Sequence, residues 1–152
     1  MPNAIERTCI ILKPDALQRN LLGDIVRRFE LKGLKIIGMK MIALSDAHLE
    51  EHYAHLKEKP FFGDIKKFMK SAPVVVLALE GADCVNAVRI LVGKTFGNEA
   101  DAGSIRGDLS MGTMNLVHAS DSVENGAAEI ARFFAPEEIF AYKKIDVDFI
   151  YG

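Results

Sequence analysis

The stretch Val74-Val75-Val76-Leu77-Ala78-Leu79, opened by Pro73, is the strongest strand signal in the chain. It is a short, continuous apolar run rich in valine, which is typical of a strand covered on both faces of a sheet. The run Thr8-Cys9-Ile10-Ile11-Leu12 has the same character, and Lys13-Pro14-Asp15 ends it. These two stretches predict buried strands, so the fold is expected to form around a sheet.

Further strands and helices are predicted outward from these runs. The strands are Leu34 to Leu44 and a short segment around Leu116. Apolar residues three and four positions apart, together with capping residues, indicate the helices. The helices are expected from about Leu22 to the stop at Gly33, from the cap Ser45 to about Lys57, and over Phe61 to Met69, Cys84 to Val92 and Val123 to Phe134.

Two segments show neither period. Gly93 to Asn115 is predicted to be a long loop, and loops of this length inside a compact domain are usually functional or disordered. The chain from about residue 136 is predicted to be an irregular tail. Both segments are expected to lie outside the regular elements.

The order of elements predicts the fold class. Strand, helix, strand, helix, helix, strand, helix, strand, helix contains two β-α-β halves. This order favours an α/β (α+β) fold of the ferredoxin-like type, with a four-stranded antiparallel sheet and helices packed on it. A chain of 152 residues with 49% hydrophobic content can bury a core without a disulfide or metal, so we expect a single domain over residues 1–152.

Composition excludes several classes of protein. Nineteen basic and twenty-one acidic residues give a net charge of −2, so there is no overall positive field to attract nucleic acid. The two cysteines, Cys9 and Cys84, have no metal-binding or redox spacing and are expected to be packing residues in a reducing compartment. No apolar run reaches the length of a membrane span, and the N-terminus has no signal-peptide core. We therefore expect a cytoplasmic protein without membrane partners.

The segment Asn115 to Asp121 contains the strongest candidate for a catalytic side chain. Apolar Leu116 and Val117 suit the end of a strand, and Ser120, Asp121 and Ser122 are residue types that cap a following helix. His118 would then lie at a strand-to-helix junction, near free backbone N–H groups that favour a bound anion. A neutral imidazole at such a junction can be a nucleophile toward a phosphate, although a lone histidine more often satisfies a local turn.

Two weaker motifs do not support other functions. Gly93-Lys94-Thr95 resembles the end of a phosphate-binding P-loop, but Val88 stands where the first glycine is required, and the triplet follows a helix. His48, His52 and His55 share a helix face, but no HExxH pattern or suitably placed carboxylate accompanies them. We interpret these histidines as an ordinary solvated face and predict no metal site held by the protein.

A dispersed set of polar residues remains. It combines cations, a hydroxyl and an amide with His118, and it comprises Lys13, Arg89, Thr95, Arg106 and Asn115. Cations and a hydroxyl converging on one histidine are typical of a phosphoryl-transfer site. Residue spacing alone does not establish this convergence.

Several motifs closely resemble the nucleoside diphosphate kinase family. They are Glu6-Arg7-Thr8, Lys13-Pro14-Asp15-Ala16, Gln18-Arg19, Lys59-Pro60-Phe61-Phe62, Ser104-Ile105-Arg106-Gly107-Asp108 and Asn115 to Asp121. The resemblance extends from about Glu6 to Tyr142. It implies a ping-pong transfer in which His118 takes the γ-phosphoryl group of a nucleoside triphosphate such as ATP and passes it to a nucleoside diphosphate.

The resemblance also implies a role for each residue of the site. Phe61 would stack on the base, and Lys13 and Asn115 would bond the ribose. The phosphates would be held by Arg89, Thr95 and Arg106, with Tyr53 close to the transferred group. Glu129 would bond the imidazole nitrogen of His118 that does not attack. Mg²⁺ would be carried mainly by the nucleotide phosphates, and the family's assembly implies a homo-oligomer with a dimer as the minimum unit.

The sequence departs from the family pattern around this site. Thr113-Met114-Asn115 replaces Gly-Arg-Asn, and the segment from Arg106 to Asn115 is one residue short. Ala119 replaces a glycine, which would cost energy if that position needed a positive φ. Phe96-Gly97 stands where the family has Asn-Pro, and Ala102 where it has proline. These changes leave open the alternative of a weakly active, nucleotide-binding regulatory homologue.

Overall fold

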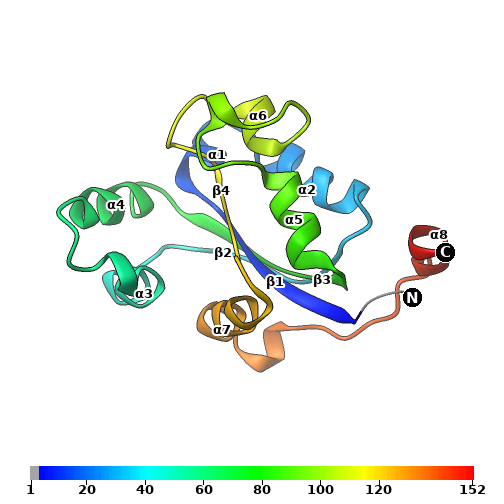
Figure 1. Ribbon diagram of the computed structural model, residues 1–152. Coiled ribbons are helices and arrows are strands. Elements are labelled where there is room, and N and C mark those ends of the chain that lie inside the picture. The colour runs from blue at the N-terminus through cyan, green and yellow to red at the C-terminus, as the bar shows by residue number, and fades with distance from the viewer. Residues whose placement is uncertain (1–3) are drawn as a thin grey trace.

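The computed structural model describes residues 4–152, which form one central sheet with helices on both faces (Figure 1). The strands are β1 (Ile5–Leu12), β2 (Lys35–Ile42), β3 (Val74–Ala82) and β4 (Val117–Ala119), in the order β2-β3-β1-β4. Every neighbouring pair is antiparallel. The ferredoxin-like fold predicted from the sequence is therefore confirmed, with β1 and β3 as the two inner strands.

The alternation of side chains along β1 divides the core into two layers. Ile10 and Leu12 face a cluster that includes residues of α1 (Pro14–Gln18), α2 (Leu22–Leu31), α5 (Cys84–Val92) and α6 (Ile105–Leu109). Cys9 and Ile11 face the other cluster, formed with α3 (Asp46–His52), α4 (Phe62–Met69) and α7 (Val123–Phe133). Because the stretch Cys9 to Leu12 is apolar at successive positions, this part of β1 fills both layers.

The register of β4 decides which layer receives its histidine. His118 lies opposite Ile11 of β1, and directly opposed residues of an antiparallel pair point to the same face of the sheet. His118 therefore faces the layer of α3, α4 and α7. This placement brings the histidine toward side chains from α3 and α7, which are far from one another in the sequence.

Short helices are the elements that sequence periodicity missed. The expected long loop contains η2 (Gly97–Glu99) and α6, and α1 follows β1 directly. The expected irregular tail contains η3 (Pro136–Glu138) and α8 (Val147–Tyr151). Helices of five residues are too short to display an apolar period, so capping residues indicate them better. The Ser104 side chain, for example, caps α6 by accepting a hydrogen bond from the Gly107 N–H.

The helix expected to run from Ser45 to about Lys57 is shorter than predicted. Its N-terminal cap is confirmed, because the Ser45 side chain accepts a hydrogen bond from the His48 N–H. The α-helix ends at His52, and Tyr53 leaves the helical conformation with φ −106° and ψ 33° before η1 (Ala54–Leu56). This break positions two successive side chains, His52 and Tyr53, beside β4.

None of the helices in residues 4–152 is both long and apolar enough to cross a membrane.

Candidate functional site

The backbone before His118 is held in an unusual conformation. Leu116 is fully buried and has a φ of +72°, in the left-handed region that non-glycine residues rarely adopt. Its N–H donates to the Asp15 carboxylate at 3.1 Å, and its carbonyl accepts from the Lys13 N–H at 2.8 Å. The segment after β1 therefore fixes the turn that leads into β4 and sets the position of His118.

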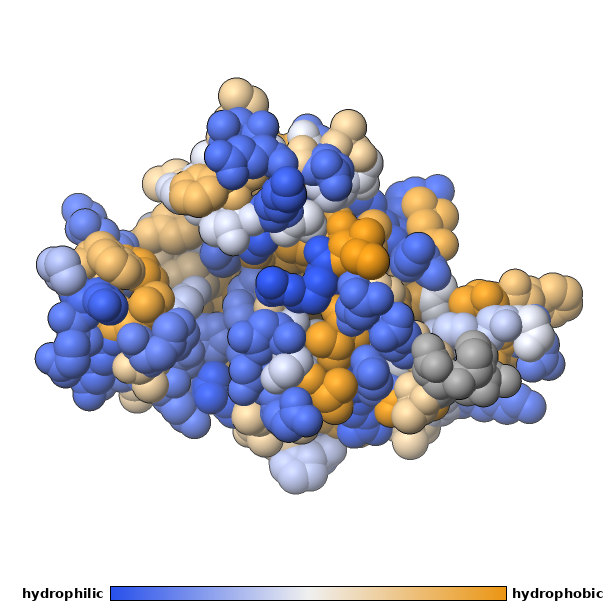
Figure 2. Space-filling view, viewed as in Figure 1, coloured by the Kyte–Doolittle hydropathy of each residue, from blue (hydrophilic) through white to orange (hydrophobic). Residues whose placement is uncertain are grey.

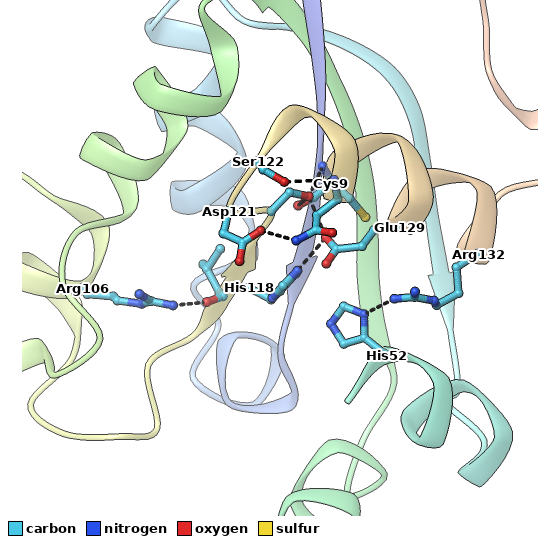
Figure 3. A network of polar contacts seen from close by, with 11 residues as sticks. Cys9, His52, Arg106, His118, Asp121, Ser122, Glu129 and Arg132 are labelled. Atoms are coloured by element: carbon cyan, nitrogen blue, oxygen red, sulfur yellow. Dashed lines mark hydrogen bonds and ion pairs between the residues drawn. The ribbon is translucent and has the colours of Figure 1, made fainter. Parts of the chain in front are cut away.

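A carboxylate contacts one nitrogen of the His118 ring. His118 Nε2 lies 2.8 Å from Glu129 Oε1 on α7, and the Ser120 hydroxyl donates to the same oxygen at 2.6 Å (Figure 3). Burial opposes ionisation of Glu129, but the hydrogen bonds from His118 and Ser120 hold its pKa below the ordinary value. A carboxylate that accepts from Nε2 places the proton there and leaves Nδ1 of a neutral ring with a free electron pair.

His52 and Tyr53 border His118 from the end of α3. The His52 ring is only 8% exposed and lies 4.5 Å from the His118 ring, centroid to centroid. The expectation that His52 belongs to a solvated face is therefore wrong. Burial and the adjacent Glu129 raise the pKa of Tyr53 to about 12, so its hydroxyl keeps its proton at neutral pH.

Two adjoining cavities meet at Tyr53. The first, about 560 Å³, is lined by His118, Glu129, Tyr53 and Arg89, among others. The second, about 850 Å³, is lined by Tyr53, Phe61, Lys13, Thr95 and Asn115, among others. In Figure 2 the surface is hollowed between the part formed by α4 and the part formed by the long loop with α6. The structure thus brings eight of the nine predicted site residues to a cleft made of these two cavities, which share Tyr53.

A chain of hydrogen bonds organises the second cavity. Lys13 Nζ donates to Asn115 Oδ1 at 2.9 Å, and Asn115 Nδ2 donates to the Thr95 carbonyl at 2.9 Å. Burial, aided by the charge of Arg106, lowers the pKa of Lys13 to about 8. A bound anion would favour the charged form of this lysine, so the group is poised to respond to a nucleotide.

Arg106 is the ninth residue, and it lies behind the cleft. Its guanidinium donates to three backbone carbonyls, those of Asn115 at 3.2 Å, Gly93 at 3.1 Å and Val117 at 2.5 Å. Burial and the nearby Arg89 lower its pKa to about 10, which leaves it charged at neutral pH. Arg106 therefore ties the long loop to β4. A direct contact with phosphate stays a prediction.

The structure shows the surroundings of the residues that depart from the family pattern. Ala119 lies within β4 and is absent from the positive-φ residues of the described chain, so the expected backbone strain does not arise. Phe96 and Met114 are about half exposed, at 47% and 62%, and both line the larger cavity. Gly97 packs on Ser110 so closely that a Cβ atom would lie 2.2 Å from the Ser110 carbonyl oxygen. Gly97 therefore occupies a position in this loop where any other residue would collide with Ser110.

Comparison with known proteins agrees with this arrangement. The family model described as nucleoside diphosphate kinase matches residues 6–139. The chain belongs to the nucleoside diphosphate kinase family. This membership makes it an enzyme that transfers phosphoryl groups, and the resemblance inferred from the motifs is confirmed.

Nucleoside diphosphate kinase relatives match almost the whole chain. The enzyme of Parabacteroides distasonis is 54% identical over 140 residues, covering 91% of this chain and 92% of the relative. Nucleoside diphosphate kinase B of Rattus norvegicus is 43% identical over 148 residues, 97% of either chain. The structure of the Halobacterium salinarum nucleoside diphosphate kinase in complex with CDP superposes with a TM-score of 0.94 at 39% identity, covering 98% of this chain and 100% of that one.

Proposed function

We propose that His118 carries the phosphoryl group in a reversible, ping-pong transfer between nucleotides. Nδ1 attacks the γ-phosphorus of a nucleoside triphosphate, a P–N bond forms as the bond to the β-phosphate oxygen breaks, and the diphosphate leaves. A second nucleoside diphosphate then takes the group by the reverse reaction. The observation that supports this most is the 2.8 Å contact between His118 Nε2 and Glu129, which leaves Nδ1 free to attack.

The nucleotide is proposed to span the two cavities. Its base would stack on Phe61 in the larger cavity, where Lys13 and Asn115 meet the ribose. Its phosphates would extend past Thr95 toward His118, where Arg89 is exposed and makes no hydrogen bond or ion pair within the described chain. Arg106 would add positive charge from behind Arg89 while it holds the loop. The Tyr53 hydroxyl would lie near the transferred group.

Mg²⁺ is proposed to arrive with the nucleotide phosphates. This cation prefers oxygen ligands in octahedral geometry. In residues 4–152, three potential ligands gather in the cleft at His52, His118 and Glu129, and two of them are imidazoles. These residues do not form an oxygen cage, so a phosphate-bound ion with few protein ligands fits the cleft better. When bound, the ion would neutralise charge that develops on the phosphate oxygens.

A labelling experiment tests the proposed transfer. The purified chain is incubated with γ-labelled ATP and Mg²⁺, and we expect an acid-labile, alkali-stable phosphoprotein that loses its label on addition of any nucleoside diphosphate. Label that binds but never becomes covalent would favour the regulatory homologue. A denaturing gel reports only covalent label, and filter binding of the native protein reports nucleotide that is merely bound, so the two readouts together separate the outcomes.

Glu129→Gln is expected to slow transfer without abolishing it. An amide keeps the size of the side chain but loses the charge that stabilises the imidazole as phosphorus bonds to Nδ1. We expect a loss of about 1–3 kcal/mol of transition-state stabilisation. Single-turnover rates of phosphoenzyme formation measure the effect. An unchanged rate would mean that Glu129 has no role in the transfer.

Phe61→Ala is expected to weaken all nucleotides by a similar factor. Phe61 is 46% exposed, so its face is available for stacking, and stacking is tolerant of base identity. The expected loss is about 1–3 kcal/mol per base. KM values for purine and pyrimidine diphosphates, with ribose or deoxyribose, measure it. A selective loss for one base would indicate an edge contact in addition to the stack.

A homo-oligomer with a dimer as the minimum unit is also proposed. β2 is an edge strand of the sheet, and Met39 and Met41 on it are 52% and 59% exposed. An apolar edge strand of this kind favours pairing with another chain. Light scattering over a dilution series is expected to give at least a dimer at micromolar concentration. A monomer at that concentration would contradict the proposal.

A cytoplasmic location is also proposed, because both cysteine thiols are free. Cys9 and Cys84 are both buried and free, and burial raises the pKa of each thiol, most strongly for Cys9. Such inert packing thiols suit a reducing compartment. Fractionation of cells that express the tagged chain would test this location.

A further inference from the structure

Among the buried histidine, arginine and glutamate side chains of residues 4–152, His52 is the one that the proposed transfer does not use. Its ring meets the His118 ring edge to face, with an interplanar angle of 80° and a centroid distance of 4.5 Å. Tyr53 and Phe133 also contact it, at centroid distances of 4.8 and 5.4 Å. The His52 ring is therefore enclosed on several sides and forms one wall of the space around His118.

Arg132 of α7 fixes the chemical form of His52. Arg132 Nη1 lies 2.9 Å from His52 Nδ1 (Figure 3). A guanidinium can only donate and stays charged in proteins, so Nδ1 must accept and cannot carry a proton. The remaining proton of a neutral imidazole then sits on Nε2. Burial, together with the neighbouring His118, lowers the pKa of His52 to about 3, which agrees with a neutral ring at ordinary pH.

The same contact argues against a metal ion at this place. Ligand atoms of His52, His118 and Glu129 lie within 4.8 Å of one another, which is close enough to consider chelation. A metal on His52 Nε2 would require the proton to move to Nδ1, where it would face the N–H of Arg132. The charge of Arg132 would also repel the cation. The cluster therefore fits a neutral packing role for His52 better.

We propose that His52 is a positioning residue that holds the nucleophilic imidazole in its working orientation. Locked by Arg132, the neutral ring packs against the His118 ring and limits its rotation away from Glu129. A neutral wall also adds no charge beside the nitrogen that must attack. The inference rests on the proposed function of His118, and it assigns a purpose to the pair formed by His52 and Arg132.

His52→Gln tests the proposal, with His48→Gln as the matched control. Both changes replace an imidazole by an amide on α3. His48 lies one turn earlier, and glutamine also suits its place in the Ser45 capping box. In single-turnover reactions with γ-labelled ATP, H52Q is expected to form phosphoenzyme about 10- to 100-fold more slowly, with little change in nucleotide KM. H48Q is expected to match the wild type within about twofold, since the change does not reach His118.

A spectroscopic readout separates positioning from a general structural effect. Nitrogen-15 spectra of His118 are expected to show one tautomer, protonated on Nε2, in the wild type and in H48Q. In H52Q a mixture of tautomers is expected. Equal rates and equal His118 spectra in H52Q and H48Q would overturn the inference. Should H52Q fail to fold, Arg132→Gln removes the lock while leaving His52 in place, and an unchanged His118 spectrum in that variant would overturn it as well.

The spectra also distinguish this inference from the proposed transfer. If the wild type formed no phosphoenzyme, the proposed function would fail. The His118 tautomer would still be readable in that protein. A change on substitution of His52 would support the positioning role even then, and no change would refute it.

Discussion

His118→Ala is expected to abolish phosphoenzyme formation and nucleotide transfer while the fold is kept. The substitution removes the nucleophilic nitrogen, and removal of a nucleophile typically costs about four orders of magnitude or more in rate. The side chain is 22% exposed, and Glu129 is the hydrogen-bond partner of its ring in the described chain. Glu129 keeps its bond from Ser120 in the variant, so its carboxylate is not left unpaired.

Two measurements decide this result. Label transferred from γ-labelled ATP reports the covalent step, and thermal unfolding reports the fold. His48→Ala serves as the control, because it removes another imidazole from the same layer. A His118→Ala protein that keeps most of its transfer activity would contradict the assignment of the nucleophile.

Arg106→Leu is expected to destabilise the protein and to remove most of its activity. The change removes the guanidinium donor from three carbonyls. Those of Gly93 and Val117 are left without it, while the Asn115 carbonyl keeps a hydrogen bond from the Val117 N–H. Each unsatisfied buried acceptor costs about 1–3 kcal/mol, so the two that remain imply a loss of roughly 2 kcal/mol or more in the free energy of unfolding. Activity should fall further because β4 and Asn115 lose their anchor. Urea unfolding, followed by kinetics under folding conditions, measures both effects.

Arg106→Lys separates the two contributions of this side chain. Lysine restores the positive charge but lacks the planar fork that reaches several carbonyls at once. We expect it to recover only part of the stability lost in Arg106→Leu. Full recovery by lysine would mean that charge matters here and that the fork does not.

The sheet and the longer helices could be predicted because their signals are strong and local. β1 and β3 are apolar at successive positions, as a strand between two packed layers requires, and α5 has the bounds expected from its spacing. The short helix α8, in contrast, depends on contacts with distant residues. Ile150 of α8, for example, packs on Gly33, and the Tyr151 hydroxyl accepts a hydrogen bond from the Ala82 N–H. Local patterns contain no record of such contacts.

The site could be predicted only in part. The pattern of Asn115 to Asp121 indicates His118, the resemblance adds Glu129, and the structure brings the two side chains together. His52 was missed, although one signal was present. It follows Leu49 by three positions, so both residues lie on the same face of α3, and both are buried. The role of Arg106 could not be predicted from the sequence either. Its guanidinium donates to backbone carbonyls, and every residue has a carbonyl, so no residue type in the sequence indicates these acceptors.

The contact between Gly97 and Ser110 links two departures that look separate in the sequence. Any side chain at Gly97 would place its Cβ 2.2 Å from the Ser110 carbonyl oxygen, and Ser110 lies in the shortened segment. The proline of the family pattern therefore does not fit beside this shorter loop. The two changes are therefore expected to be epistatic, so that the cost of Gly97→Pro should depend on the length of the segment that carries Ser110.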